Sequence, residues 1–551
     1  IILMLTEKEN KKINRIQIRI KFLFLCFFLG FSILSAKLFY LASMSFDPNN
    51  ERQKQITQKS ERPHIYDRND NLVALNIDIS SVAIRPDILS NKDDVIDRIL
   101  SAVPNFYRED LENKILNDKK FVWLKRGVTP KERQRIHNLG IPGIQFIEET
   151  KRFYSAANTL SNVIGYVNID NKGQTGIEKY IDQNLNKEIT EDIHLSIDLE
   201  VSHAIRDELL KSMRKYSAKG AASVLMNVNT GEVISMTSLP DFDPHYPKDA
   251  LKPENINRVT KAVYEIGSTF KAFTAAMALD SGVVDLDTIY DATNPIKIGR
   301  HSISDFHAKN RELTVEEIFI YSSNIGSAKM ALDFGVEYHK SFLKKLGFMD
   351  QISSELPDPS KNIIPPNWKE INTMTISFGH GIAITPLHAA VAGASLVNGG
   401  RLIHPTFLKK NTNETIDYSQ VIDPTTSDKL KKLMYLNVIN GSGKNAAVDG
   451  ILVGGKTGSA EKVSDKTYEK NKLRTTFLGA FPINEPKYIL FLLLDEPEGI
   501  EETHGYATAG YNVAPTFSNI VTRIAPMLDI IPSEFDTLNE FDQITVALNS
   551  L

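Results

Sequence analysis

The N-terminal part of the chain is dominated by a long apolar run. Residues 22–36 are almost all apolar, and the run continues past Lys37 to Ala42, which gives 21 residues, enough to cross a bilayer as a helix. A cleaved signal peptide is the alternative interpretation, because residues 43–45 form a small-x-small cleavage site. A retained transmembrane anchor at 22–43 is favoured, since the run exceeds a usual signal core and Lys37 can extend to the interface.

The charge and polarity around this run indicate its orientation. Five basic side chains precede it: Lys11, Lys12, Arg15, Arg19 and Lys21. By the positive-inside rule, residues 1–21 form a cytoplasmic tail, and the chain after the run lies on the other side of the membrane. Residues 44–61 are polar and predict a stalk that leaves the membrane.

Residues 62–193 predict a mixed module without catalytic groups. Two short strands around an Asn/Asp turn are expected within 65–75, and a third strand is expected at 80–86. Helices and loops follow, with no pair of nucleophile and base that could support catalysis. The region is therefore predicted to be a non-catalytic pedestal.

A second domain is expected at 194–535, followed by a C-terminal tail at 536–551. Apolar residues recur at helical spacing near its start: Val201, Ala204, Ile205, Leu209 and Met213. Five apolar segments predict strands, the first two joined by a hairpin turn at 229–231: 221–228, 232–238, 451–455, 475–481 and 488–494. Because residues 260–445 are mainly helical in pattern, the domain is predicted to be α+β, with an antiparallel five-stranded sheet packed with helices.

Composition narrows the functional classes. A chain of 551 residues suggests about three or four units, and 42% hydrophobic with 24% charged residues is typical of folded protein. The net charge of -4, with no cationic excess beyond the N-terminus, argues against a nucleic-acid surface. The only cysteine, Cys26, lies in the apolar run, which excludes a disulfide framework, a thiolate zinc cluster and a cysteine nucleophile.

A serine stands three residues before a lysine in Ser268-Thr269-Phe270-Lys271, at the start of an apolar run that predicts a helix. Gly267 would turn the backbone into this helix, and Gly282 would end it. Ser268 and Lys271 would share a helix face, so a neutral lysine amine could take the hydroxyl proton as the serine attacks a carbonyl. The spacing alone is weak, because it recurs elsewhere: Ser212/Lys215, Ser341/Lys344 and Ser459/Lys462.

Two further motifs change the interpretation of this serine. Ser322-Ser323-Asn324 and Lys456-Thr457-Gly458-Ser459 follow in an order that is the signature set of penicillin-recognising serine acyl-enzymes. Burial and a nearby Lys456 would lower the pKa of Lys271 enough for it to act as a base. Ser322 could relay a proton, Asn324 could hold Lys271 or a substrate amide, and Ser323 is interpreted as spacing. Taken alone, the second motif could be a capping serine and a turn asparagine.

The third motif predicts a strand that binds substrate. Lys456 and Gly458 would face opposite to Thr457 and Ser459. Gly458 would let a peptide lie along the strand, with the backbone amides of Ser459 and Ser268 donating to the developing oxyanion. Lys456 and Thr457 would bind a terminal carboxylate of the peptide. A glycine bulge in an edge strand is the alternative interpretation.

The remaining polar groups are interpreted as solvated. His301 and His307 lie near Asp305, but metal-ligand spacing and a third ligand are missing, so a solvated loop is favoured. The acidic residues between 495 and 502 predict an exposed turn after a strand. Neither a cofactor nor a metal is expected.

These motifs resemble class B penicillin-binding proteins, the peptidoglycan DD-transpeptidases. The resemblance runs from the anchor to about residue 525, and residues 257–260 and 306–311 are most similar to the division-specific septal enzyme of Gram-negative bacteria, especially alphaproteobacteria. Further shared segments are Asp67-Arg68-Asn69, Gly176-Ile177-Glu178, Thr230-Gly231-Glu232, Ser377-Phe378-Gly379-His380-Gly381 and Thr385-Pro386-Leu387. The chain departs from the family pattern at four positions: Pro63, Ile266, Ala272 and Ser459.

The resemblance implies a mechanism and site residues. A serine attacks the D-Ala-D-Ala amide of a stem peptide, expels D-alanine and holds an acyl-enzyme until an amine from a neighbouring strand resolves it, while β-lactams imitate that substrate. Catalytic roles fall to Ser268, Lys271, Ser322, Asn324 and Lys456, and substrate contacts to Thr457, Gly458 and Ser459.

The resemblance also implies a location and partners. The pedestal, a dimerisation-like domain, would dock a membrane glycan polymerase of the SEDS family and other division proteins, on a single-pass protein of the inner membrane with its catalytic domain in the periplasm. An elongation-type transpeptidase, a β-lactam sensor and a β-lactamase are the alternatives.

Overall fold

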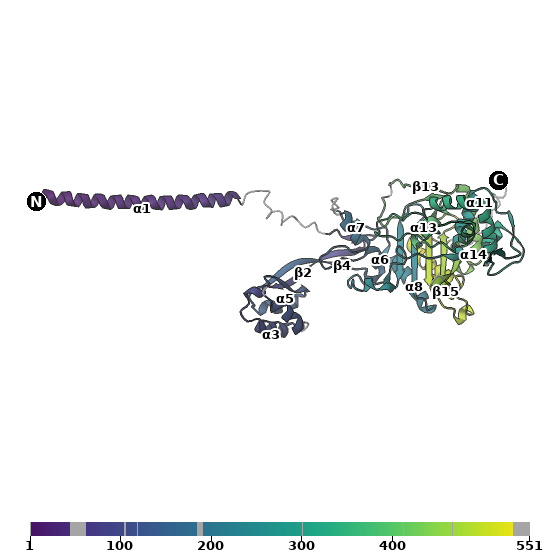
Figure 1. The fold of residues 1–551 in the computed structure, drawn as a ribbon, viewed down its shortest axis with the longest axis horizontal. Helices are drawn as coiled ribbons and strands as arrows, with labels where there is room; N and C mark the ends of the chain where they lie inside the picture. The colour runs from purple at the N-terminus through teal and green to yellow at the C-terminus, as the bar shows by residue number, and fades with distance from the viewer. Residues whose placement is uncertain are drawn as a thin grey trace. The chain divides into compact units, whose positions relative to one another are not determined.

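The computed structural model describes residues 2–44, 62–103, 106–117, 119–184, 191–299, 301–411, 413–464 and 467–532. The predicted stalk apart from Met44, the predicted C-terminal tail, and Ser45 of the alternative cleavage site lie outside these residues. The chain forms two compact units, Ile1–Arg62 and Pro63–Leu551, and Figure 1 labels some of their elements.

The first unit contains one long helix. α1 (Ile2–Met44) includes the apolar run and the basic flank before it. Its segment Gln17–Tyr40, 24 residues, is long and apolar enough to span a membrane by length and composition. The helix begins well before the apolar run because the flanking Lys, Arg, Gln and Ile residues also adopt helical conformation readily. The predicted apolar N-terminal helix is therefore confirmed, as part of a longer helix.

The second unit begins with a sheet built on one long strand. β2 (Leu72–Ile84) pairs with β1 (Ile65–Tyr66), β3 (Val122–Val128) and β4 (Ile144–Tyr154), and β5 (Ile193–His194) pairs in parallel with β1. The two strands predicted within 65–75 are confirmed. The separate third strand predicted at 80–86 is wrong, because β2 continues through it without a break.

The uninterrupted β2 has a physical explanation in its surroundings. Its middle is exposed, and polar residues there lie opposite residues of β4, with Asn76 facing Arg152 and Asp78 facing Thr150. In the sequence, Asn76 and Asp78 suggest a loop. In the structure they lie in the middle of a two-stranded ribbon, and the two ends of this ribbon enter different cores. Figure 1 shows β2 and β4 side by side along this ribbon.

Each end of the ribbon carries its own helices. At one end, the core that includes Val82 and Ile84 also includes buried residues of α3 (Lys92–Ala102), α4 (Arg108–Ile115) and α5 (Pro130–Asn138). At the other end are α6 (Ser161–Ile164) and α7 (Gly176–Asn184). A fully buried ion pair of 2.7 Å between Arg152 Nε and Glu178 Oε1 joins β4 to α7.

The second sheet is antiparallel throughout, in the order β14-β15-β16-β6-β7. Its strands are β6 (Gly220–Asn227), β7 (Val233–Leu239), β14 (Gly454–Ser464), β15 (Thr467–Phe481) and β16 (Tyr488–Asp495). The five-stranded sheet and the turn between its first two strands are confirmed. β14 starts later than the strand predicted at 451–455 and runs on through the third motif, because that motif pairs with β15 residue by residue.

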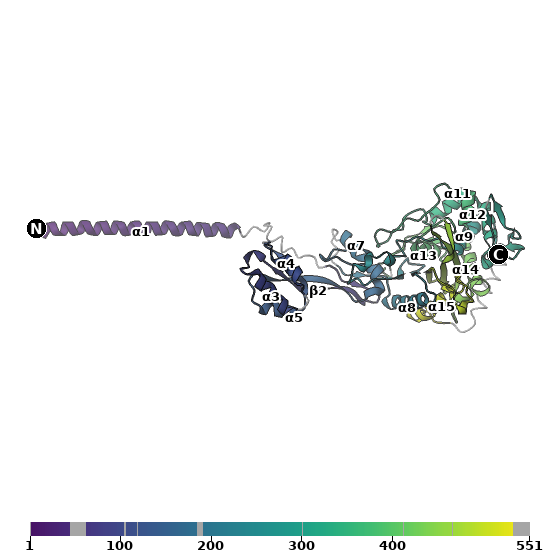
Figure 2. The ribbon, with the colours of Figure 1, turned by 60° about the horizontal axis from the view of Figure 1, so that its bottom comes forward.

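Alternating side chains of this sheet enter two different cores. Phe491 and Leu493 of β16 join one core, while Leu490 and Leu492 join the other. The second core contains α8 (Leu199–Lys215) and α15 (Val513–Ile524), and most of the residues predicted on one face of α8 are buried there. The other face carries the helices that hold the first two motifs. Figure 2 labels α8 and α15 next to each other.

Those helices, with short strands between them, lie within residues 260–445. The helices are α9 (Lys271–Asp280), α10 (Val315–Tyr321), α11 (Asn324–Lys345), α12 (Glu370–Ile376), α13 (Pro386–Ser395) and α14 (Pro424–Asn440). The short strands are β8 (Ile289–Asp291), β9 (Ile296–Ile298), β10 (His301–Ile303), β11 (Glu312–Thr314), β12 (Arg401–Leu402) and β13 (Ser419–Gln420). This arrangement confirms the predicted α+β fold.

The acidic run after β16 differs from its prediction. Asp495 is buried, and Glu496 forms ion pairs with Lys219 and Lys462. Asp495 also lies 3.4 Å from Arg474. The turn is present, but its first two carboxylates are not exposed, because cations from three different segments of the chain surround them.

Candidate active site

The serine of the first motif lies on a tight turn that leads into a buried helix. Ser268 belongs to the 3-10 turn η6 (Gly267–Phe270), and Lys271 is the first residue of α9. Gly267 has φ 54°, a conformation that side chains disfavour, and Gly282 after the helix has φ 71°. Ser268 is half-buried, whereas Lys271 is only 2% exposed. The predicted helix with its two glycines is confirmed.

Three glycines fix this turn against the rest of the site. A Cβ atom on Gly267 would lie 2.5 Å from the Ser459 carbonyl oxygen, one on Gly458 would lie 2.1 Å from the Ile266 carbonyl oxygen, and one on Gly379 would lie 2.0 Å from the Gly267 carbonyl oxygen. We call these three residues the glycine junction. Gly458 therefore has a role beyond the predicted room for substrate, because it lets β14 approach the turn that contains Ser268.

Lys271 is held by the second motif. Its Nζ lies 2.5 Å from the Ser322 carbonyl oxygen, 2.7 Å from Asn324 Oδ1 and 3.1 Å from Ser322 Oγ. Burial holds the pKa of Lys271 well below its usual value, and the neighbouring Lys456 lowers it further, while Asp305 opposes this. Burial and a neighbouring cation, the two causes expected to lower the pKa of Lys271, are therefore both present.

Lys456 reaches the same serine from the sheet. Its Nζ is 3.1 Å from Ser322 Oγ and 5.8 Å from the centre of the Phe319 ring. The side chain is fully buried, and burial lowers the pKa of Lys456 to about 7. Ser322 ends α10 in a left-handed conformation, with φ 59°. Its hydroxyl consequently lies between two amines whose pKa values are both lowered by burial.

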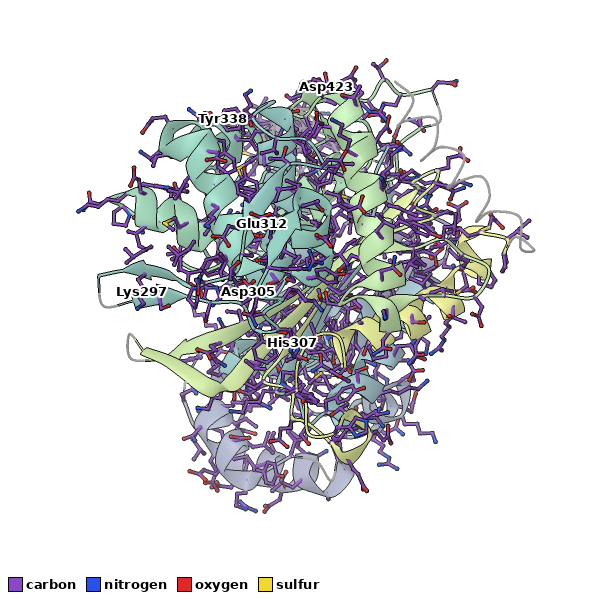
Figure 3. All side chains as sticks on the ribbon, turned by 90° about the vertical axis from the view of Figure 1, so that its right-hand side faces the viewer. Lys297, Asp305, His307, Glu312, Tyr338 and Asp423 are labelled. Carbon is purple, nitrogen blue, oxygen red and sulfur yellow. The ribbon has the colours of Figure 1, made fainter. Side chains whose placement is uncertain are left out.

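Ser323 has a larger role than the predicted spacing. It caps α11, because Gly326 N donates to its Oγ at 3.0 Å, and the same Oγ donates to Asp305 Oδ2 at 2.7 Å. Asp305, predicted to belong to a solvated loop, is thus part of the support of the second motif. Figure 3 labels Asp305 and His307. Among the described residues, no group of three or more His, Cys, Asp or Glu is placed to hold a metal ion.

The other side chains of the third motif point away from Lys271. Thr457 Oγ1 is 2.5 Å from Ser442 Oγ, and Ser459 Oγ accepts from Ala509 N at 3.0 Å. Strand alternation accounts for this division. Because the oxygen of Ser459 accepts a backbone N–H, its own O–H can donate to a ligand. Ser442 and Ala509 were not indicated by the sequence.

The arrangement supports nucleophilic acyl chemistry. A half-buried serine lies within a tight turn, a buried amine of lowered pKa follows three residues later, and a second serine connects that amine to another. Buried cations with lowered pKa values beside a nucleophile are typical of a catalytic centre.

Comparison with known proteins gives two family matches. Residues 221–522 match the model described as penicillin binding protein transpeptidase domain, and residues 57–190 match the penicillin-binding protein dimerisation domain. The chain is 34% identical to a probable peptidoglycan D,D-transpeptidase FtsI of Caulobacter vibrioides, over 85% of this chain and 82% of that protein.

Two further relatives extend this similarity over nearly the whole chain. A probable peptidoglycan D,D-transpeptidase PenA of Neisseria meningitidis is 28% identical over 96% of each protein. A peptidoglycan D,D-transpeptidase FtsI of Buchnera aphidicola is 28% identical over 91% of this chain and 92% of its own length.

Proposed function

Because this chain belongs to the penicillin-binding protein transpeptidase family, we propose that it is a class B peptidoglycan DD-transpeptidase of the septal type. It cross-links stem peptides through a serine acyl-enzyme, and β-lactams acylate the same serine. The observation that carries this proposal is the meeting of all three motifs at Ser322, whose Oγ lies 3.1 Å from Lys271 Nζ and 3.1 Å from Lys456 Nζ.

Acylation follows from the protonation state of Lys271. The Ser268 hydroxyl loses its proton to the neutral amine of Lys271 as its oxygen attacks the carbonyl carbon of the penultimate D-alanine. The amide carbon–nitrogen bond then breaks, and the proton passes through Ser322 to the leaving amine of the terminal D-alanine. Lys456 completes this relay from the sheet side. An amine of a second stem peptide reverses these steps and releases Ser268.

The substrate is bound along β14. The backbone amides of Ser268 and Ser459 stabilise the oxyanion, and Gly458 leaves the edge of the strand open to the peptide. Donors at Lys456, Thr457 and Ser459 bind the terminal carboxylate by charge-assisted hydrogen bonds. No cofactor is required for these steps.

The membrane topology and the partners complete the proposal. Residues 1–21 stay in the cytoplasm, 22–43 anchor the protein in the inner membrane, and the rest of the chain lies in the periplasm. Residues 62–193 form a pedestal that docks a SEDS-family glycan polymerase and other division proteins, and 194–535 form the transpeptidase domain. The apolar segment Gln17–Tyr40 supports a single membrane span. External protease should digest the bulk of the chain in spheroplasts, and protection of the C-terminal domain would contradict this topology.

A fluorescent penicillin tests the enzymatic proposal. Full-length protein in detergent should be labelled at Ser268, retain the label for many minutes and cross-link peptide donors, whereas Ser268→Ala protein should remain unlabelled. Rapid release of the label would indicate a β-lactamase, and labelling without cross-linking would indicate a sensor. Depletion in cells should give filaments that do not divide, while rounded cells would indicate the elongation enzyme.

A further inference from the structure

The loop after β10 runs directly beside the second motif. Asp305 Oδ2 accepts from Ser323 Oγ at 2.7 Å, and its Oδ1 accepts from Ile325 N at 2.9 Å. The residue before it contributes a third bond, because the Ser304 carbonyl oxygen accepts from Asn324 Nδ2 at 2.9 Å. The loop therefore binds Asn324 itself and both of its neighbours in the chain.

These contacts determine which end of the Asn324 amide faces Lys271. A carbonyl oxygen can only accept, so the group next to the Ser304 carbonyl must be the amide NH2. Asn324 Oδ1 then points at Lys271 Nζ, 2.7 Å away. A rotated amide would place two oxygens against each other at Ser304 and an N–H donor against Lys271.

The amide orientation decides where the lone pair of Lys271 points. A neutral amine has two N–H donors and one lone pair. Two acceptors that cannot donate, the Ser322 carbonyl oxygen at 2.5 Å and Asn324 Oδ1 at 2.7 Å, take both N–H groups. The remaining partner of Lys271 Nζ is the Ser322 hydroxyl at 3.1 Å, which can rotate its own proton away and leave the lone pair for the proton of Ser268. With the amide rotated, Asn324 Nδ2 would donate to that lone pair and the base would be blocked.

We propose that Asp305 is a positioning residue for acylation, which, together with the adjoining Ser304 carbonyl, holds Asn324 in the orientation that leaves the lone pair of Lys271 free. This inference rests on the proposed function, in which Lys271 is the base for Ser268. Asp305 does not contact substrate in this mechanism. It acts through Ser323 and Ile325, which bracket Asn324 at the start of α11.

The charge of Asp305 provides a readout that a purely structural role would not change. Three titratable groups face Lys271 from different elements: Lys456 from β14, His380 from the loop after α12, and Asp305. The carboxylate of Asp305 raises the pKa of Lys271 against burial and Lys456. Acylation requires neutral Lys271, so its rate rises as pH increases through that pKa. Removing the charge of Asp305 should therefore move the acid limb of the rate profile to lower pH.

Three variants of the full-length protein test this inference, with His380→Gln as a further control. Asp305→Asn keeps the size of the side chain but loses one acceptor and the charge. Ser323→Ala removes one of the two bonds by which Asp305 brackets Asn324, while keeping the charge. Asp423→Asn is the matched control, because Asp423 also caps a helix, accepting from Thr425 N, and lies well apart from Asp305 in Figure 3. Stopped-flow acylation by a fluorescent penicillin, measured between about pH 5 and pH 9, separates penicillin affinity from the acylation step.

We expect Asp305→Asn to slow the acylation step about tenfold or more, since positioned bases contribute about 100-fold to 10,000-fold, with unchanged initial affinity. Its acid limb should lie at lower pH than that of the wild type. Ser323→Ala should slow acylation without moving the limb, and Asp423→Asn should change neither. The limb should persist in His380→Gln protein, which excludes protonation of His380 as its origin.

The possible failures are distinguishable. If wild-type protein is not acylated at Ser268, the proposed function is wrong. If the wild type is acylated and Asp305→Asn has the same rate constant, or is slower with an unmoved acid limb, Asp305 does not act on Lys271 and the inference is wrong. A circular dichroism spectrum and melting temperature equal to those of Asp423→Asn establish that the variant is folded.

Discussion

Replacing Gly458 by alanine would test whether the nucleophile turn depends on close backbone contact with β14. The added Cβ atom would lie 2.1 Å from the Ile266 carbonyl oxygen, 2.5 Å from Thr269 Oγ1 and 2.6 Å from Thr476 Oγ1. The first of these atoms belongs to the main chain just before Ser268. It cannot rotate away as a side chain would, so the strand and the turn must separate.

The size of the effect follows from that distance. An ordinary carbon–oxygen contact is about 3.3 Å, so the two segments must move apart by roughly 1 Å. A displacement of about 1 Å in a catalytic group lowers rates about 100-fold, which corresponds to about 2.7 kcal/mol of activation free energy. Overpacking of this kind also lowers the free energy of unfolding by about 1–3 kcal/mol.

Gly455→Ala is a control on the same strand. Its Cβ would lie 2.5 Å from a Phe477 ring atom and 2.8 Å from the Leu478 carbonyl oxygen, both on β15 and not on the nucleophile turn. Acylation by a fluorescent penicillin should be measured per folded molecule, together with the melting temperature. Both variants should melt earlier, but only Gly458→Ala should lose about 100-fold in acylation rate. A folded Gly458→Ala protein that acylates as fast as Gly455→Ala would refute the reasoning.

Three further changes have defined outcomes. Thr457→Val keeps the shape of the side chain but removes its hydroxyl, which lies 2.5 Å from Ser442 Oγ. Acylation by a peptide with a free terminal carboxylate should slow about tenfold, because a charge-assisted hydrogen bond to that carboxylate is lost. The loss should nearly vanish for the amidated peptide, and equal slowing would make Thr457 purely structural. Glu178→Gln removes the carboxylate that binds the buried Arg152 at 2.7 Å. Urea denaturation should show that the free energy of unfolding falls by about 3–5 kcal/mol. A decrease below about 1 kcal/mol, as for an exposed pair, would contradict this. Burial raises the pKa of Glu496, but its ion pairs with two lysines lower it to about 2. These ion pairs therefore stabilise the folded protein above the unfolded pKa of about 4.3, and the stabilisation is lost as the pH falls toward the folded pKa. Glu496→Gln should therefore lower the melting temperature at pH 7 and not near pH 2, and a difference independent of pH would contradict the linkage.

Much of the fold could be predicted because the relevant signals are local. Two apolar runs joined by a short turn define β6 and β7, whose residues are nearly all buried, and the spacing of Val201, Ala204 and Ile205 defines the buried face of α8. The local pattern did not predict β2 correctly, because this strand has polar residues in its exposed middle, between the two cores that its ends enter. It also failed for Asp495 and Glu496, whose cations come from distant segments.

The side chains that we propose to be catalytic were predictable from motif order, but the residues that support them were not. Ser268, Lys271, Ser322 and Lys456 occur in sequence patterns whose chemistry is specific only as a set. Asp305, Ser442 and Ala509 carry no pattern, because they matter only through contacts with residues 18, 15 and 50 positions away. Such contacts depend on how helices and loops pack, which no single segment of the sequence specifies.

The glycine junction also bears on how this protein can evolve under antibiotic selection. At Gly267, Gly379 and Gly458, the smallest possible side chain would meet a main-chain oxygen at 2.0 to 2.5 Å, so codon changes at these positions would displace the nucleophile and impair cross-linking together with drug binding. Changes that reduce β-lactam acylation selectively must arise where side chains border the site, as at the partly exposed Tyr321 and His380. In resistant lineages, we expect variation around the junction and three unchanged glycine codons within it.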